Sequence, residues 1–317
     1  MTADLRTPLL SWYAAHARDL PWRRPGVGAW PVMMSEFMLQ QTPVARVLPV
    51  YAAWAAQWPR PANLAAEPAG AAIRAWGRLG YPRRALRLHA AATVITERHS
   101  GQVPSTIGAL RALPGVGDYT AAAIASFAFG QRHVVLDTNV RRVLSRVVVG
   151  TEFPSGSLTV AERRRAAGLM PADPSTAAQW AVAVMELGAL VCTAAAPRCT
   201  DCPIADACQW RALGHPAYAG PPRRRQSYDG TDRQCRGRLL AVVRDRQGPA
   251  PRSALEAAWS DGVQRERALD GLVSDGLVEP LHDDRYALPR GTEVSPRSWP
   301  APPAPRPGSR PWTCPRT

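Results

Sequence analysis

Two acidic residues in this sequence could act as a pair of catalytic carboxylates. Glu36 lies between Trp30 and Gln41, in a segment whose apolar residues follow the spacing of a buried helix. Burial raises the pKa of a carboxyl group because it penalises the charged form. Asp137 directly precedes a second predicted helical segment, residues 138–144. Two carboxyls in different surroundings can protonate a leaving group and stabilise a positively charged sugar, which is the chemistry of glycosidic bond cleavage.

Each acid also has an ordinary structural interpretation. A glutamate on a helix most often faces solvent, and an aspartate before a helix most often caps its N-terminus. Both alternatives stay open for Glu36 and Asp137 while residue type and spacing alone are considered.

Four cysteines form a second chemical pattern within one short stretch. Their spacing is C-x6-C-x2-C-x5-C, and they are Cys192, Cys199, Cys202 and Cys208. Thiolates are soft ligands that suit iron–sulfur clusters or zinc. A four-cysteine zinc site usually combines two distant C-x2-C pairs, whereas this loop contains one. The spacing therefore favours one [4Fe–4S] cluster over the zinc alternative, in a structural role because protein fills all four ligand positions.

A glycine-containing turn joins two predicted helices, Ile107–Ala112 and Asp118–Phe129. Its residues are Leu113, Pro114, Gly115, Val116 and Gly117. The glycines allow a sharp turn with exposed amides, and the first amides of the second helix can bind a phosphate. This is a helix-hairpin-helix signature; the alternative is a helical joint that binds nothing.

The charge of the chain indicates a polyanionic partner. Its formal net charge is +14, and all 39 basic residues are arginines, with no lysine. Basic contacts to phosphates release counterions, so a nucleic acid is the favoured partner over a basic surface kept for solubility. The absence of lysine also means that no side-chain amine can form a Schiff base.

The elements that must position these residues are helices. Residues from about Leu5 to Leu213 have apolar residues at three and four spacing, with prolines and glycines at the joints, which predicts an all-α domain over 1–213 including the cysteine loop 192–208. Residues 214–232 are expected to be a linker. Residues 233–289 show three helical segments and a hairpin, which predicts a small winged-helix-like domain, with an unspecialised mini-domain as the alternative.

Two further expectations concern the ends and the compartment. The Pro- and Arg-rich segment 290–317 is predicted to be disordered. No signal peptide or membrane-spanning segment is recognised, so a cytoplasmic, monomeric, bacterial-type protein is expected. Arg236, Arg238, Arg252, Arg265 and Arg267 are expected to contact the phosphate backbone from the small domain.

Five segments, in order along the chain, closely resemble the MutY adenine DNA glycosylases of the endonuclease III superfamily. They are W-P-V-M-M-S-E-F-M-L-Q-Q-T-P-V from Trp30, L-P-G-V-G-D-Y-T from Leu113, V-L-D-T-N-V-R-R-V-L from Val135, M-E-L-G-A from Met185 and the cysteine pattern. The resemblance covers roughly residues 5–212. It implies a two-lobed helix-hairpin-helix glycosylase fold with a [4Fe–4S] cluster loop. The implied reaction is base excision repair: hydrolysis of the N-glycosidic bond of adenine opposite 8-oxoguanine or guanine in double-stranded DNA.

The resemblance also implies roles for individual residues. Glu36 corresponds to the general acid that protonates adenine, and Asp137 to the carboxylate that stabilises the sugar cation, by its charge or by transient covalent attachment. Tyr119 and Asn139 correspond to their hydrogen-bonding partners. The wall of the base pocket corresponds to Arg18, Trp22, Arg23 and Glu186. The residues that wedge into the duplex as adenine is flipped out correspond to Gln41 and Tyr81, with Thr42 beside them.

Tyr119 separates two activities within the superfamily. Bifunctional relatives place a lysine at this position and nick the strand through a Schiff base, so this chain is expected to be monofunctional. A pyrimidine-directed glycosylase-lyase of the same fold is one alternative, and a non-catalytic DNA-binding or redox-sensing module is another. The chain departs from the resemblance at its second domain, because residues 233–289 are too few for the usual Nudix-like domain that probes the oxidised guanine.

Overall fold

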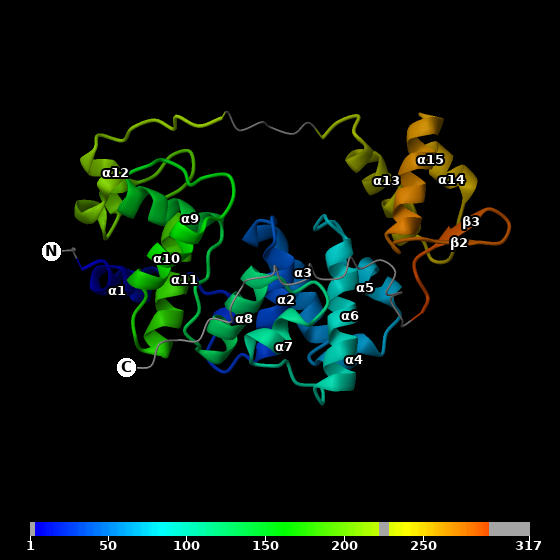
Figure 1. Ribbon diagram of the computed structural model, residues 1–317. Helices are drawn as coiled ribbons and strands as arrows, with labels where there is room; N and C mark the ends of the chain where they lie inside the picture. Colours follow the sequence, from blue (N-terminus) through cyan, green and yellow to red (C-terminus); the bar gives the residue numbers. More distant parts are fainter. Residues whose placement is uncertain (1–3, 222–227, 292–317) are drawn as a thin grey trace, which may run out of the picture. The chain divides into compact units, whose positions relative to one another are not determined.

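The computed structural model describes residues 4–221 and 228–291 (Figure 1). Within these residues the chain contacts divide into two units, one formed by 4–66 and 75–221 and the other by 67–74 and 228–291. The tail expected to be disordered and the middle of the expected linker, residues 292–317 and 222–227, lie outside the described residues. No helix in the described ranges is long and apolar enough to cross a membrane.

The chain up to residue 221 is helical, as expected, and no strand occurs in its described part. Its elements are α1 (Arg6–His16), η1 (Pro21–Arg23), α2 (Ala29–Leu39), α3 (Val44–Gln57), α4 (Pro61–Ala65), α5 (Ala69–Trp76), α6 (Arg83–Arg98), α7 (Ile107–Arg111), α8 (Asp118–Phe129), α9 (Thr138–Leu144), η2 (Ser145–Val149), α10 (Val160–Leu169), α11 (Pro174–Leu190), η3 (Cys199–Asp201), η4 (Ala205–Ala207) and α12 (Gln209–Ala212).

These helices form two lobes. In one lobe α2 packs against α3, α6 and α8, while α4 packs against α6 and α7 against α8. In the other, α11 packs against α1 and α9, and the π-helical turn η2 packs against α9 and α12. Contacts between α8 and α11 join the lobes. The two-lobed helical fold is therefore confirmed.

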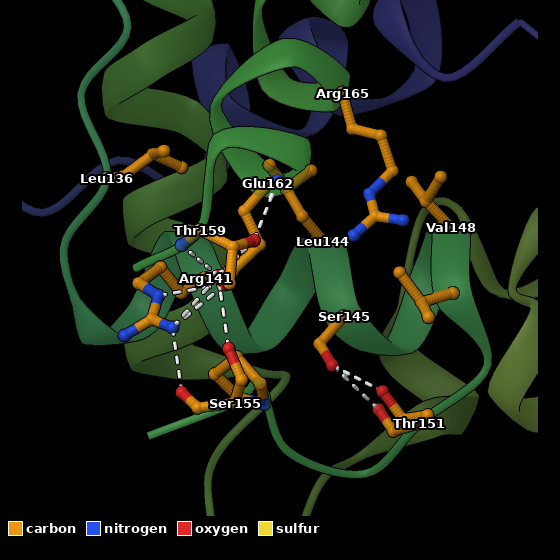
Figure 2. Close-up of a pocket in the computed structure, with 12 residues that line it drawn as sticks. Leu136, Arg141, Leu144, Ser145, Val148, Thr151, Ser155, Thr159, Glu162 and Arg165 are labelled. Atoms are coloured by element: carbon orange, nitrogen blue, oxygen red, sulfur yellow. Dashed lines mark hydrogen bonds and ion pairs between the residues drawn. The ribbon is translucent and has the colours of Figure 1, made fainter. Parts of the chain in front are cut away.

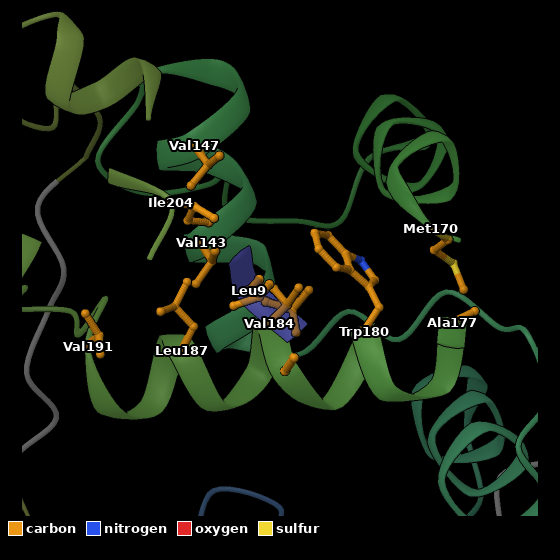
Figure 3. Packing of buried hydrophobic residues seen from close by; sticks show 12 residues of the cluster. Leu9, Val143, Val147, Met170, Ala177, Trp180, Val184, Leu187, Val191 and Ile204 are labelled. Atoms are coloured by element: carbon orange, nitrogen blue, oxygen red, sulfur yellow. The ribbon is translucent and has the colours of Figure 1, made fainter. Parts of the chain in front are cut away.

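The second lobe is built around one face of α11. Trp180, Val184 and Leu187 are buried on this helix and point toward Leu9 of α1 and Val143 of α9 (Figure 3). Full burial of such side chains typically contributes about 1.5–3 kcal/mol each. The core fixes α9 and α11 against each other, and both helices carry predicted site residues.

The second unit has the element order of a winged helix. Its elements are α13 (Asp232–Arg244), β1 (Ala250–Pro251), α14 (Arg252–Ala258), α15 (Gly262–Ser274), β2 (Glu279–Leu281) and β3 (Arg285–Ala287). The three strands form an antiparallel sheet in the order β1-β3-β2. The three expected helices and the hairpin are all present, and β1 is an addition.

Residues 67–74 belong to this second unit through backbone hydrogen bonds. The N–H of Gly70 donates to the carbonyl of Pro289 at 2.9 Å, and the N–H of Ala69 donates to Gly291 at 3.1 Å. A Cβ on Gly70 would lie 2.5 Å from the Pro289 oxygen, so this close approach needs glycine. Arg74 donates to the carbonyls of Arg244 and Arg246.

The expectation that five arginines of this unit face DNA is not supported. Four of them form ion pairs within the unit: Arg236 with Asp275, Arg252 with Glu266, Arg265 with Glu256 and Glu266, and Arg267 with Asp232. Arg238 stacks over the ring of Trp259. Residues 228–291 contain ten arginines and eleven acidic residues, so this part of the chain is not basic.

Candidate active site

Glu36 lies in the interior of the first lobe. It belongs to α2, where every residue from Val32 to Met38 is buried, and its own exposed fraction is 7%. Burial, followed by the charge of Asp137, raises the pKa of Glu36 to about 7. The hydrogen bond from Tyr119 and the charge of Arg23 oppose this rise. A carboxyl group with this pKa can hold a proton at neutral pH and give it up.

Tyr119 lies in the first turn of α8 and its hydroxyl reaches Glu36. Its hydroxyl shares a hydrogen bond with the Glu36 carboxyl group. Burial and the neighbouring acids hold the pKa of Tyr119 well above its usual value, so the hydroxyl stays protonated and donates. Tyr119 therefore orients the Glu36 carboxyl group.

Asp137 caps the N-terminus of α9 and is also paired on its other oxygen. The N–H of Val140 donates to Oδ1 at 2.6 Å, and Nδ2 of Asn139 donates to Oδ2 at 2.8 Å. Burial raises the pKa of Asp137, while these bonds oppose the rise because they favour the anion. The cap interpretation is thus confirmed, and the catalytic role of Asp137 stays a prediction.

Arg142 holds the amide of Asn139 from the opposite side. Its Nη2 donates to Oδ1 of Asn139 at 2.9 Å and to the carbonyl of Gly188 at 2.7 Å. Its Nε donates to the carbonyl of Cys192 at 2.9 Å. One buried guanidinium therefore connects the partner of Asp137 with the first residue of the cysteine loop.

Gly188 allows α11 to approach α9 at this point. A Cβ on Gly188 would lie 2.8 Å from Cβ of Asn139 and 3.1 Å from its carbonyl oxygen. Any larger residue must push the Asn139 backbone away. Packing against Asn139 therefore requires glycine at this position of M-E-L-G-A.

Glu186, two residues earlier on α11, is held by two arginines. Nε and Nη2 of Arg18 donate to its two oxygens at 2.7 and 2.8 Å, and Nη1 of Arg23 donates at 2.9 Å. Although burial raises the pKa of Glu186, these arginines hold it below its usual value. Trp22 is buried beside Arg23 on η1. The four predicted base-pocket residues thus come together, and Arg23 also acts electrostatically on Glu36.

The two predicted wedge residues lie in separate turns. Gln41 follows α2 with φ of +55°, and Tyr81 precedes α6 with φ of +47°. Both side chains reach the surface, with Tyr81 46% exposed. Thr42, in contrast, is buried and its hydroxyl bonds to the carbonyls of Gln40 and Leu79, so its role is internal rather than a contact to DNA.

The predicted hairpin lies between α7 and α8 with its apolar side chains turned inward. Leu113 and Val116 are buried, and Gly115 has φ of +76°. A Cβ on Gly115 would lie 2.7 Å from Cβ of Arg87 on α6, so glycine is required there. Gly117 caps α8 with backbone alone. This leaves the backbone of the turn, rather than its side chains, as the surface that could contact a phosphate.

The four cysteines line one cavity in the second lobe, with Val147, Leu187 and Val191 as apolar walls. None of the four forms a disulfide. Within the described residues, no three His, Cys, Asp or Glu side chains gather closely enough to hold a single metal ion. Four thiols that line one cavity supply the soft ligands that an iron–sulfur cluster or a zinc ion takes.

Arg146 supports this cavity from η2. It is 1% exposed, and its Nη1 donates to Sγ of Cys192 at 3.4 Å and to the carbonyl of Thr193 at 2.7 Å. Its guanidinium also stacks over the ring of Trp210. This places a buried cation beside the first cysteine of the loop.

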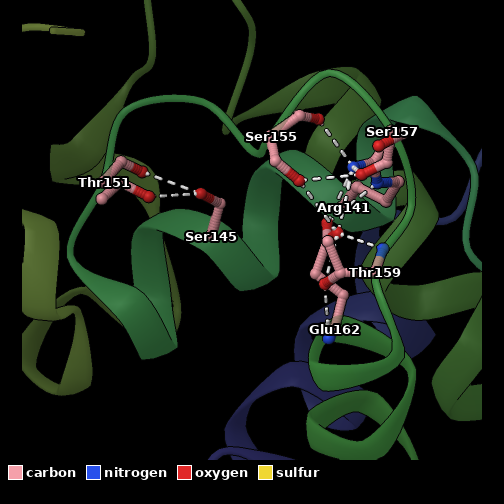
Figure 4. Close-up of polar contacts among 7 residues, drawn as sticks. All are labelled: Arg141, Ser145, Thr151, Ser155, Ser157, Thr159 and Glu162. Atoms are coloured by element: carbon pink, nitrogen blue, oxygen red, sulfur yellow. Dashed lines mark hydrogen bonds and ion pairs between the residues drawn. The ribbon is translucent and has the colours of Figure 1, made fainter. Parts of the chain in front are cut away.

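A separate cavity of about 260 Å³ lies beside α9, η2 and α10 (Figure 2). Leu136, Leu144 and Val148 line it, and the side chain of Arg165 points over it, but neither Glu36 nor Asp137 does. One side is closed by Arg141, which forms two hydrogen bonds with Glu162, the residue of α10 that completes the capping box with Thr159 (Figure 4). This cavity plays no part in the site described above.

Comparison with known proteins assigns a family to this geometry. Residues 34–166 match the HhH-GPD superfamily of base excision DNA repair proteins. The adenine DNA glycosylase of Mycobacterium tuberculosis is 51% identical over 284 residues, covering 89% of this chain and 93% of the relative. The chain belongs to the adenine DNA glycosylase family. It is therefore a base excision repair enzyme that hydrolyses N-glycosyl bonds.

A more distant relative and two solved structures are also similar to this chain. The human adenine DNA glycosylase is 42% identical over 214 residues, covering 65% of this chain and 39% of the relative. A thermostable thymine-DNA glycosylase structure has a TM-score of 0.58 at 25% identity and covers 65% of this chain and 94% of its own. An endonuclease III–DNA complex has a TM-score of 0.56 at 21% identity, covering 68% and 99%, and shows the shared fold.

Three residues that support the candidate site were not singled out from the sequence: Arg142, Arg146 and Gly188. Two of them are buried arginines in a chain with 39 basic residues, so residue type does not distinguish them from solvated ones. For Arg142 a signal exists, because it lies three residues after Asn139 on the same helix and can reach that side chain.

Proposed function

We propose that this adenine DNA glycosylase removes adenine opposite 8-oxoguanine or guanine from double-stranded DNA, as a monofunctional, monomeric enzyme of the cytoplasm. The observation that carries the proposal is the buried carboxyl pair. Glu36 has its pKa raised to about 7, while Asp137 receives two hydrogen bonds that favour its anion. Adenine is a poor leaving group without a proton, and its departure leaves a positive sugar, so these two acids match the two needs of the reaction.

Glu36 is proposed to donate a proton to a ring nitrogen of adenine as the C1′–N9 bond breaks. The bonding electron pair leaves with the base, and the proton neutralises it. Tyr119 holds the carboxyl group in place by its hydrogen bond. Typical general acid catalysis is worth roughly 100- to 10,000-fold in rate.

Asp137 is proposed to stabilise the cation formed at C1′, by its charge or by a transient bond from a carboxylate oxygen. Water then adds to C1′ and loses a proton; where the carboxylate has bonded to C1′, that C–O bond breaks and Asp137 leaves as the free carboxylate, giving an abasic sugar. Asn139 donates to Oδ2 of Asp137, and this hydrogen bond favours the anion. In the base pocket, the Arg18–Glu186–Arg23 group offers both donors and acceptors to the edge of the flipped adenine.

The monofunctional proposal is supported by Tyr119. A lyase of this fold needs an amine to attack C1′, and the sequence contains no lysine. The hydroxyl that occupies this position stays protonated beside Glu36.

DNA is proposed to be held by backbone and wedge together. The amides of the turn at Gly115 and Gly117 are proposed to bind a phosphate at the N-terminus of α8. Gln41 and Tyr81 are proposed to enter the duplex and fill the space that the flipped adenine leaves. A stacked aromatic side chain typically contributes about 1–3 kcal/mol per base.

The cysteine loop is proposed to hold one [4Fe–4S] cluster through Cys192, Cys199, Cys202 and Cys208. The apolar cavity, the four free thiols around it and the guanidinium of Arg146 support this assignment. When bound, the cluster would cross-link the loop between α11 and α12 by iron–thiolate bonds.

The experiment that tests the function is single-turnover excision from duplexes with adenine opposite 8-oxoguanine, guanine or thymine, and thymine opposite guanine. Excision of adenine from the first two without strand nicking is expected, and borohydride should trap no covalent adduct. Excision of thymine, or trapping of an adduct, would favour the pyrimidine-directed lyase. Because the second unit is small, discrimination between 8-oxoguanine and guanine is expected to be modest.

A further inference from the structure

Arg84, near the start of α6, is almost completely buried, with an exposed fraction of 4%. Its Nη1 donates to the carbonyls of Phe37, Met38 and Gln40 at 2.9, 3.1 and 2.5 Å. Its Nη2 donates to the carbonyl of Gly80 and to Oγ1 of Thr42, both at 3.0 Å. Five acceptors from two separate turns thus converge on one guanidinium group.

The two turns are those of the wedge residues. The Gln40 carbonyl precedes Gln41, and the Gly80 carbonyl precedes Tyr81. Both following residues have positive φ, +55° and +47°, a region that costs about 1–2 kcal/mol for a residue with a side chain. Arg84 accordingly bonds to the peptide group immediately before each strained residue.

Arg84 also fixes these turns to their surroundings. The carbonyls of Phe37 and Met38 belong to the last turn of α2, where backbone oxygens lack helical partners. The guanidinium lies 5.6 Å from the ring centre of Tyr81 and 5.2 Å from that of Trp76. The same side chain thus contacts the helix that carries Glu36, the backbone before Gln41, and both the backbone and the ring of the Tyr81 turn.

We infer that Arg84 is a positioning residue that holds Gln41 and Tyr81 at a fixed separation for entry into the duplex. The inference rests on the wedge role proposed above. Because Arg84 is buried, it does so without touching DNA. Because the fold already holds the two wedge residues in place, little conformational entropy is lost when they enter the duplex. Less of the binding energy is therefore lost when adenine is extruded.

Lysine cannot replace this arginine. A guanidinium offers five donors in one plane and stacks on aromatic rings, whereas an ammonium group offers three donors at one point. Burial lowers the pKa of Arg84 to about 10, so the group is still charged at neutral pH and donates to every acceptor. Arg84→Lys therefore retains the charge and loses the bridge.

The test compares two substrates with Arg84→Lys. One is a duplex with adenine stacked opposite guanine, and the other has the same adenine facing a one-nucleotide gap, where no partner base must be displaced. We expect single-turnover excision to fall on the order of 10- to 100-fold on the first and less than about 3-fold on the second. In the same variant, 2-aminopurine at the adenine position should show a smaller fluorescence rise on binding.

Equal losses on both substrates, with an unchanged 2-aminopurine signal, would overturn the positioning role while leaving the adenine glycosylase assignment intact. Failure of the unchanged enzyme to excise adenine from either duplex would overturn the proposed function and this inference with it. Arg244→Lys, at a buried arginine of the second unit that is 7% exposed, is the matched control and should leave both rates unchanged.

A second variant guards against misfolding of Arg84→Lys. Thr42→Val keeps the shape of the side chain and removes one of the five acceptors, so it should give the same substrate-selective loss at a smaller size. In a Tyr81→Ala background, Arg84→Lys should add little further loss, because both changes act through the same wedge. Full additivity of the two losses would count against the inference.

Discussion

Nη2 of Arg142 donates to Oδ1 of Asn139 and thereby determines which end of that amide faces Asp137. The acceptor end of Asn139 is occupied by the guanidinium, so only its NH₂ group is left for Oδ2 of Asp137. The amide cannot rotate by 180° without placing two donors against each other. The hydrogen bond that favours ionised Asp137 is therefore determined by a residue that does not touch it.

This relationship predicts how Asp137→Asn behaves. Asparagine caps a helix nearly as well as aspartate, so the cap alone would survive. The new NH₂ group, however, would meet the NH₂ group of Asn139, and a buried donor without a partner typically costs about 1–3 kcal/mol. We expect loss of excision together with a lower melting temperature, measured by circular dichroism.

The exchange Asp137→Asn with Asn139→Asp separates the two effects. In the exchanged pair the carboxylate accepts from Arg142 and from the neighbouring amide, so every donor has a partner. We expect the melting temperature to recover while excision stays lost, because the charge has moved away from the cap position. Recovery of excision would show that the position of the carboxylate is not what matters.

Glu36 predicts a descending limb in the pH–rate profile. If the protonated form is the general acid, single-turnover rate falls as pH rises through about 7, the pKa to which burial and Asp137 raise this group. Glu36→Gln should lose on the order of 100- to 10,000-fold in rate at pH 6.5 and retain duplex binding. A variant with wild-type rates would exclude Glu36 from the chemistry.

The same shift has a consequence for stability. Glu36 has a higher pKa in the folded chain than the ordinary 4.5. Its stabilising contribution to the free energy of unfolding is therefore fully present below pH 4.5 and is lost as pH rises through about 7. Glu36→Gln removes this loss and should raise the free energy of unfolding by roughly 3 kcal/mol at pH 8 relative to its effect at pH 4.5. Denaturant titrations at the two pH values measure the difference; equal effects at both would show that the carboxyl group is not desolvated.

The cysteine loop gives a prediction independent of activity. Anaerobically purified protein should contain about four iron and four sulfide per chain and absorb in the blue-visible region. Arg146→Met removes the donor to Sγ of Cys192 and the link to Thr193, so it should speed iron loss to a chelator and shift the reduction potential. Zinc in place of iron would overturn the cluster.

The ion pairs of the second unit predict that removing its arginines does not change how duplex binding depends on salt. A phosphate contact changes the slope of log K against log salt concentration by about 0.9. Arg252 and Arg267 already pair with Glu266 and Asp232, in a unit with more acids than bases. We expect Arg252→Gln and Arg267→Gln to leave the slope for duplex binding unchanged. A slope reduced by a full contact in either variant would return that residue to the DNA interface.

Local signals were enough to place most of the helices. Asp118–Phe129 agrees with the prediction at both ends, because Gly117 and Gly130 mark them in the sequence. The helix of Glu36 was predicted to run to Gln41 and ends at Leu39, because Gln40 leaves the helical region with ψ of 109° before Gln41 adopts positive φ. Helix α13 begins at Asp232, one residue before the predicted start of the small domain at 233, because the side chain of Thr231 caps it.

Non-local relationships escaped the sequence. One hundred residues lie between Glu36 and Asp137 in the sequence, so no local pattern predicts that they pair. Their pairing was predicted from the motifs that resemble a known family. Two-residue strand β1 depends on pairing with β3, and Gly70 on its approach to Pro289, neither of which leaves a local pattern. The same holds for Arg84, because four of its five acceptors lie more than forty residues before it in the sequence.

The close packing at Gly188 shows that the site also needs a residue that has no polar side chain and that a search for polar residues would miss. One methyl group there would collide with Cβ of Asn139, 2.8 Å away, and displace the residue whose amide donates to Oδ2 of Asp137. Such a chain would still carry every acid, arginine and cysteine of the site. A variant of this kind changes none of the polar or ligand residues of the site. It would nevertheless impair repair and raise the mutation rate of the cell that carries it.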